Sequence, residues 1–136
     1  MTLEEKQNHM IQEINALGDC FDQYSYLIIK GQQLPHMPEA RKTDEALVSG
    51  CQSQVWLYVW EEHQCLRFNV DSDTLIIRGV LQLLKELLEF SPLVEASKLP
   101  IHLFTDTELA ATFTSDRNTG VQTIIKMLQS LKSTGC

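Results

Sequence analysis

The chain has 136 residues, of which 43% are apolar and 21% charged, and this composition predicts one globular domain, residues 1–136, with a sizeable core. Its formal net charge is −7, which argues against nucleic acid as a partner because a phosphate backbone is also negative. The first residues are acidic and polar, and no apolar run approaches the ~18 residues of a membrane span. We therefore expect a cytoplasmic protein without a membrane partner.

Two amphipathic helices are predicted at the start of the chain. The first opens with a capping-box pattern, Thr2-x-x-Glu5, and its apolar residues recur at helical spacing until Gly18 ends the segment. Asp19 is suited to cap the second helix, whose apolar stripe is expected to stop at Gly31.

A small antiparallel sheet of about three strands is predicted next. A proline-containing loop at 32–44 leads to a candidate short strand at 45–48. The apolar run at 55–60 and the alternating run at 65–70 indicate two further strands joined by a turn. One face of so small a sheet has to be covered by helices.

The C-terminal half supplies helices for that purpose. The segment 74–90 has an apolar stripe too wide for an exposed helix, which predicts the central core helix. The acidic and hydroxyl side chains at 71–73 are suited to cap its start. A short helical piece is expected after the pattern Thr105-x-x-Glu108, and a last helix from residues 114–116 onwards. The predicted fold class is α+β, with helices packed on a small antiparallel sheet.

The four cysteines differ in their sequence context. The closest two are 14 positions apart, so neither a zinc site nor a dithiol pair is indicated, and all four should be free thiols in a reducing compartment. Cys20 is interpreted as a packing residue, Cys65 as an inert strand residue and Cys136 as part of a tail. Cys51 follows Gly50 and precedes short polar residues and an apolar strand, a context typical of a reactive thiol displayed on a loop.

The segment around this thiol resembles the SufE family of sulfur acceptors, which take persulfide sulfur from a cysteine desulfurase for iron–sulfur cluster assembly. Residues 50–56, Gly-Cys-Gln-Ser-Gln-Val-Trp, resemble the family signature. The resemblance covers roughly residues 20–132. It includes the Gly-x-x-Leu-Pro element at 31–35, and Asp-Ser-Asp at 71–73 followed by the basic-Gly pair at 78–79.

The C-terminal motif departs from the family pattern. Residues 116–120 keep Arg117 and Gly120 of a Ser-Arg-Ser-Gln-Gly motif but lose both serines and the glutamine. The Gln-Ser-Gln sequence after Cys51 is more similar to the SufE branch than to the CsdE branch.

Several expectations follow from this resemblance. It implies a fold like that of iron–sulfur scaffold proteins, with Cys51 as the persulfide acceptor on the loop between the first two strands. It implies an accessory protein that stimulates a SufS-type desulfurase and passes the sulfur to SufBCD-type scaffolds, not an independent enzyme. No cofactor is expected on this chain, since the pyridoxal phosphate belongs to the desulfurase. The sequence leaves open a monomer or a homodimer.

The chemistry expected of Cys51 is a displacement analogous to thiol–disulfide exchange, in which the thiolate attacks the outer sulfur of the donor persulfide. A thiol with a pKa of ~8.5 is only a few per cent ionised at neutral pH, so one nearby cation matters. Arg117 is the candidate cation if the last helix begins near the loop. Asp71 and Asp73 are candidate supports for Arg117 or for the loop, and Gln52 is expected on the recognised surface.

Two other function classes remain open from the residues alone. A stand-alone thiol enzyme would pair Cys51 with a histidine, although the four histidines of the chain show no such spacing. A non-catalytic interaction module would use an exposed apolar patch, and its thiol would be incidental.

Overall fold

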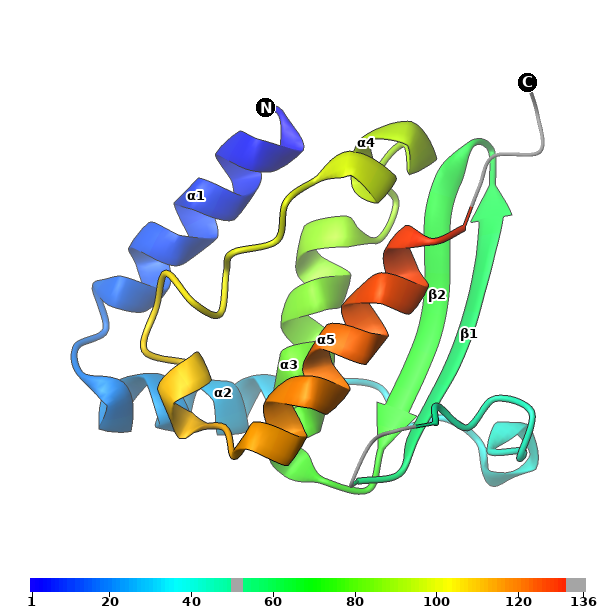
Figure 1. The fold of residues 1–136 in the computed structure, drawn as a ribbon, viewed down its shortest axis with the longest axis horizontal. Helices are drawn as coiled ribbons and strands as arrows, with labels where there is room; N and C mark the ends of the chain where they lie inside the picture. Colours follow the sequence, from blue (N-terminus) through cyan, green and yellow to red (C-terminus); the bar gives the residue numbers. More distant parts are fainter. Residues whose placement is uncertain (50–52, 132–136) are drawn as a thin grey trace.

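The computed structural model describes residues 1–49 and 53–131, and residues 50–52 and 132–136 lie outside the described part. Figure 1 shows α-helices packed on one side of an antiparallel hairpin, which confirms the predicted α+β class. The described helices and strands are α1 (Leu3–Asn15), α2 (Cys20–Gln33), β1 (Val55–Glu62), β2 (Cys65–Ser72), α3 (Leu75–Leu88), α4 (Leu93–Lys98) and α5 (Ser115–Gln129), with 3-10 turns at Glu39–Arg41 and Ala110–Thr112. In this described part no helix has the length and apolarity needed to cross a membrane.

The first two helices begin with reciprocal caps. The Thr2 hydroxyl accepts from the Glu5 N–H at 3.1 Å, while the Glu5 carboxylate accepts from the Thr2 N–H at 3.0 Å, as the capping-box pattern predicts. Asp19 and Asp22 form a second reciprocal cap at the start of α2. These starts could be predicted because all of their partners lie within three residues.

Gly31 lies inside α2 and does not end it, so the predicted stop is wrong. A Cβ atom at Gly31 would meet the backbone carbonyl of Leu75 on α3, and one at Gly79 would meet the carbonyl of Leu27 on α2. The two glycines let the helix backbones approach where α2 crosses α3. Gly31 therefore serves helix packing, and α2 continues to Gln33.

The two strands form a hairpin with a tight turn. Val55 pairs with Ser72 at one end, and Glu62 pairs with Cys65 at the other. The two residues between the strands, His63 and Gln64, both have positive φ, at 53° and 66°, the backbone of a two-residue hairpin turn.

The third predicted strand is reduced to a single bridge, so the sheet has two strands and not about three. Leu47 bridges to Trp56, with Val48 N–H donating to the Val55 carbonyl at 2.8 Å. The chain turns at residues 44–46, where the Ala46 N–H donates to the Thr43 carbonyl at 3.2 Å. Pairing of this segment with β1 is therefore confined to the bridge between Leu47 and Trp56.

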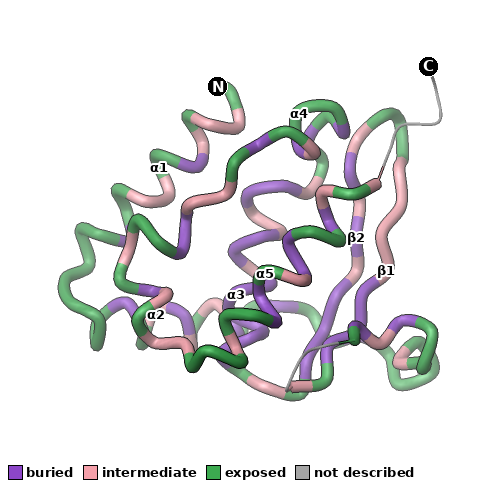
Figure 2. Tube along the Cα trace, in the orientation of Figure 1, coloured by how far each residue is buried: buried purple, intermediate pink, exposed green. Residues whose placement is uncertain are grey.

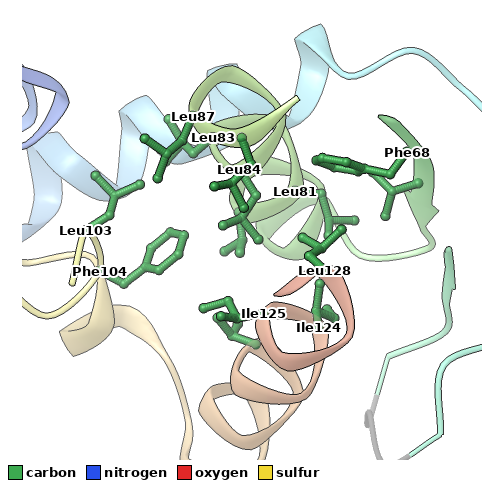
Figure 3. Close-up of a cluster of buried hydrophobic side chains, with 14 of the residues drawn as sticks. Phe68, Leu81, Leu83, Leu84, Leu87, Leu103, Phe104, Ile124, Ile125 and Leu128 are labelled. Carbon is green, nitrogen blue, oxygen red and sulfur yellow. The ribbon is translucent and has the colours of Figure 1, made fainter. Parts of the chain in front are cut away.

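The core is built around α3. Its side chains are buried almost throughout, as the wide apolar stripe predicts (Figure 2). Figure 3 shows its leucines meeting α5 and β2 in one apolar cluster. The members labelled there are Phe68, Leu81, Leu83, Leu84, Leu87, Leu103, Phe104, Ile124, Ile125 and Leu128. The burial of Leu66, Phe68 and Val70 confirms the alternation predicted for β2 and places the hairpin against α3 and α5.

The predicted cap of α3 is confirmed only at Ser72, whose hydroxyl oxygen accepts from the Thr74 N–H at 3.2 Å just before the helix. Asp71 and Ser72 are the last residues of β2, and the N-cap residue Thr74 makes no side-chain capping bond. The Asp71 and Asp73 carboxylates instead accept from backbone N–H groups in segments before β1. The helix also ends at Leu88, two residues before the predicted Phe90.

The segment after α3 differs most from prediction. α4 was not expected, although Leu93 and Ala96 have the spacing of its buried side. The helical piece expected after Thr105 is only a 3-10 turn at Ala110–Thr112, and the Thr105 hydroxyl donates to the His102 carbonyl instead of capping a helix. The last helix begins where predicted, with Thr114 as its N-cap.

Candidate functional site

The predicted sulfur acceptor Cys51 and its neighbour Gln52 lie outside the described residues, so the site is built from the segments on either side of them. Before them, Val48 is hydrogen-bonded to Val55 at the start of β1. After them, Ser53 and Gln54 precede the same strand. Both ends of this connection are therefore fixed at one edge of the sheet.

Residues at and directly after the end of β2 form hydrogen bonds with Ser53 and Gln54. The Gln54 N–H donates to Asp73 Oδ1 at 3.1 Å, and its carbonyl accepts from Ser72 Oγ at 2.8 Å. Thr74 Oγ1 lies within hydrogen-bond distance of two side chains, 2.7 Å from Ser53 Oγ and 3.0 Å from Asp73 Oδ1. Asp73 is thus a support for the residues that follow the thiol, one of the two alternatives left open by the sequence.

The first turn of α5 lies beside Ser53. Arg117 and Asp116 line a small cavity of about 10 Å³ together with Ser53 and Val55, and Ile77, Gly120 and Ile124 complete its walls. The Arg117 N–H donates to the Thr114 hydroxyl at 3.2 Å, which fixes the start of the helix. The structure therefore places Arg117 next to a residue two positions from Cys51, the proximity that its proposed role requires.

Within the described chain the Arg117 guanidinium has no ion-pair partner. Its carboxylate neighbour in the cavity, Asp116, precedes it in the same helical turn and makes no salt bridge with it. The carboxylate of Asp73, the other candidate partner, is hydrogen-bonded to Gln54 and Thr74. A guanidinium without an ion pair is available to stabilise an anion close to it.

Asp71 lies elsewhere and does not belong to this cavity. Its carboxylate is fully buried and pairs with Arg78, while the Met37 N–H donates to it at 2.9 Å and the Ser72 N–H at 2.8 Å. Burial raises the pKa of Asp71, but the two N–H donors together with Arg78 and Lys42 outweigh it and hold the pKa below its usual value. Asp71 is a structural residue that fixes the segment after α2.

The described cysteines and histidines lie away from the cavity. Cys20 is exposed at the start of α2, so its interpretation as a packing residue is wrong, and Cys65 is half-buried on β2. None of the four histidines, all described, lines the cavity beside Ser53. Among the described residues no group of three histidine, cysteine or acidic side chains could hold a metal ion.

The contact between Ser53, which lies in the signature segment, and Thr74 could not be predicted from the sequence. Their hydrogen bond joins residues 21 positions apart, and the cavity adds Ile77 and Ile124 from two helices. Helical periodicity marks both isoleucines only as core residues. No local pattern could have connected them to the thiol.

Comparison with known proteins gives a consistent result. The family model described as "SufE: Fe-S metabolism associated domain" matches residues 8–132. The "Sulfur acceptor protein CsdE" of Escherichia coli is 32% identical over 105 residues, covering 76% of this chain and 71% of that protein. The "Cysteine desulfuration protein SufE" of Wigglesworthia glossinidia brevipalpis is 27% identical over 135 residues, covering 96% and 91%.

A solved structure supports the fold. The solution structure of a hypothetical protein from Thermus thermophilus matches with a TM-score of 0.75 at 18% identity, covering 92% of this chain and 91% of that one. Relatives named SufE and CsdE both match, so the assignment to the SufE branch stays a prediction.

Proposed function

The chain belongs to the SufE family and has a role in iron–sulfur metabolism, and from this premise we propose that it is the sulfur acceptor of a SufS-type cysteine desulfurase. In this proposal Cys51 receives the persulfide sulfur, the desulfurase is stimulated, and the sulfur passes to SufBCD-type scaffold proteins in the cytoplasm. The observation that supports it best is the Arg117 guanidinium, without an ion pair in the described chain, in the cavity beside Ser53.

The proposed reaction requires little from this chain. The Cys51 thiolate attacks the outer sulfur of the donor persulfide, the donor S–S bond breaks, and the desulfurase cysteine leaves as a thiolate. The proton lost by Cys51 is balanced by one taken up by the leaving thiolate, so no external oxidant or reductant is needed. Arg117 would favour the anionic sulfur on Cys51 before and after transfer.

The two alternative classes have less support. A cysteine–histidine enzyme needs a histidine near the thiol, and none of the described histidines lies in the Ser53 cavity. An interaction module would not need a cation without an ion pair beside the thiol loop. Substitution of Cys51 by serine separates the classes, because only the module would keep its function.

The central experiment is mass spectrometry of the chain after incubation with a cysteine desulfurase and cysteine. We expect a gain of one sulfur on Cys51, no gain in Cys51→Ser and an unchanged gain in Cys65→Ser. Sulfur on another cysteine in the Cys51→Ser variant, with desulfurase stimulation intact, would show that the assignment is wrong.

Arg117 can be tested separately from Cys51. We expect Arg117→Gln to slow sulfur transfer by about tenfold and to shift the pH profile of Cys51 alkylation upward, because the thiolate loses a neighbouring cation. Arg117→Lys should retain most of the rate. The matched control is Lys126→Gln, which removes the same charge from an exposed residue of α5. An unchanged pH profile in Arg117→Gln would remove Arg117 from the mechanism.

A further inference from the structure

A second cavity, of about 140 Å³, lies beside β2 and the segment that follows α2. Asn69 and Val70 of β2 line it together with Lys85 of α3, and residues 34–38 and 41 form its rim. It shares no lining residue with the cavity beside Ser53. In Figure 1 the segment after α2 passes the strands near the start of β1 and the end of β2.

Every ionisable residue that lines this cavity is basic. These residues are His36, Arg41 and Lys85, in a chain whose net charge is −7. Lys42 lies close by, with its ammonium 4.9 Å from the centre of the Trp56 ring. The fold thus brings Lys85 of α3 to the basic residues of the segment after α2, a proximity that the sequence did not predict.

The carboxylates nearest to the cavity are already paired with basic side chains. Glu89 Oε1 lies 2.7 Å from Lys85 Nζ, and Glu39 lies 3.2 Å from Lys42 Nζ. Asp71 Oδ2 is 3.9 Å from His36 Nδ1, but this carboxylate is paired with Arg78. None of these acids lines the cavity.

Two donors in the cavity have no acceptor. The Arg41 guanidinium stacks on the Tyr58 ring, 4.5 Å from its centre, and forms no ion pair within the described residues. The side-chain amide of Asn69, directly opposite Tyr58 in the sheet, makes no hydrogen bond within the same part of the chain. A guanidinium and an amide that converge on one space suit a carboxylate, which accepts from both.

The cavity is also held in place before any ligand binds. The Tyr58 hydroxyl donates to the Arg41 carbonyl at 2.5 Å, and the Met37 N–H donates to Asp71 at 2.9 Å. Pro35 and Pro38 restrict the backbone of the rim. A site that is already ordered loses less entropy on binding.

We propose that this cavity is a carboxylate-binding site in which Arg41 and Asn69 contact the ligand. The volume accommodates one acidic side chain or one small dicarboxylate. The ligand is therefore either a free small carboxylate or an acidic side chain presented by a partner protein. The proposed site does not involve Cys51. The test of carboxylate binding is therefore independent of the test of sulfur transfer.

The test is a nuclear magnetic resonance titration of the full chain at low ionic strength, with sodium succinate, an end-blocked tetraglutamate peptide and the matching tetraglutamine peptide. We expect saturable shifts of the Asn69 side-chain amide and the Arg41 Nε–H with at least one carboxylate probe and none with tetraglutamine. Saturation by succinate would identify a free carboxylate as the ligand. Saturation by tetraglutamate alone would identify an acidic segment of a partner.

Variants decide whether the shifts report this site. Arg41→Gln should weaken binding by about tenfold or more, because a charge-assisted hydrogen bond is lost. Arg41→Lys, which keeps the charge, should weaken it less, and Lys126→Gln should leave it unchanged despite the same loss of charge as Arg41→Gln. The proposal is overturned if neither carboxylate probe gives saturable shifts, if tetraglutamine binds equally well, or if Arg41→Gln binds like the wild type.

Discussion

At the scale of single residues, Asp71 and Asp73 show how two positions in one strand–helix junction acquire different roles. Asp71 pairs with Trp56 across the sheet and is fully buried, with Arg78 as its ion-pair partner. Asp73 is exposed and holds Gln54. Strand alternation separates their side chains from that of Ser72, but it does not indicate which long-range partner each will meet. The sequence therefore identified both as supports without distinguishing them.

We predict that Asp71→Asn lowers the free energy of unfolding by about 3 to 5 kcal/mol at pH 7, because it leaves Arg78 buried without its counter-charge. The pKa of Asp71 is lowered in the fold, so its contribution is present above the unfolded value of about 4 and is lost as pH falls through the folded pKa. The difference between wild type and variant should shrink below pH 4 in urea unfolding experiments.

The control for this prediction is Glu62→Gln, which breaks the more exposed ion pair between Glu62 and Arg67 at 2.7 Å. An exposed pair contributes about 0 to 1 kcal/mol, so this variant should unfold close to the wild type. Equal effects of the two substitutions, or a difference for Asp71→Asn that does not change between pH 6 and pH 3, would contradict the role given to Asp71.

At the scale of elements, the hairpin contains a turn that its residues do not favour. His63 and Gln64 both have positive φ, a conformation that costs a non-glycine residue about 1 kcal/mol or more. We predict that changing them to Asn-Gly raises the free energy of unfolding by about 1 kcal/mol, because this dipeptide is the preferred one for such a turn. Glycine at the strand residue Glu62 should instead destabilise the hairpin. A double variant no more stable than the wild type in urea would refute the prediction.

Elements whose determinants lie close together in the sequence could be predicted, and those that depend on distant residues could not. Helix starts depend on partners within three residues, so the capping box at Thr2 was visible in the sequence. Strand β2 was visible through its alternation, which burial on one face enforces. Gly31 was misinterpreted because its reason for being glycine is the carbonyl of Leu75, which only the crossing of α2 and α3 brings near. The prediction of a third strand was wrong for a related reason, because pairing of this segment with β1 depends on where the chain turns before it.

At the scale of the whole molecule, polar contacts hold α1 to a segment about 90 residues away. Gln7 is fully buried, its side chain donating to the Pro100 carbonyl at 3.0 Å and accepting from the His102 N–H at 2.9 Å. Asn15 donates to the Asp106 carbonyl at 3.0 Å. In an amphipathic pattern both would be assigned to the solvent side, so the docking of α1 could not be predicted from its own sequence. It depends instead on the geometry around residue 102.

His102 makes this docking dependent on pH. Its two ring nitrogens lie 2.7 Å from Glu4 on α1 and 2.7 Å from Asp106, and only the protonated ring donates to both. The hydrogen bond to Glu4 raises the pKa of His102; burial opposes this, but the contact with Asp106 adds to the rise, and the net pKa is raised. Because the folded value is raised, the contribution to stability is full below the unfolded pKa of about 6.5 and is lost as pH rises through the folded value.

We therefore predict that the free energy of unfolding falls between pH 6 and pH 8.5 and that the α1 amides lose protection from hydrogen exchange over the same range, beyond the change in intrinsic exchange rate. His102→Gln should remove most of this dependence. His9→Gln is the matched control, since His9 lies on the exposed side of α1 and forms an ion pair with Glu13 at 3.1 Å within that helix. If wild type and His102→Gln respond equally to pH, then α1 is held by Gln7, Asn15 and apolar packing alone, and the charge on His102 contributes nothing to its docking.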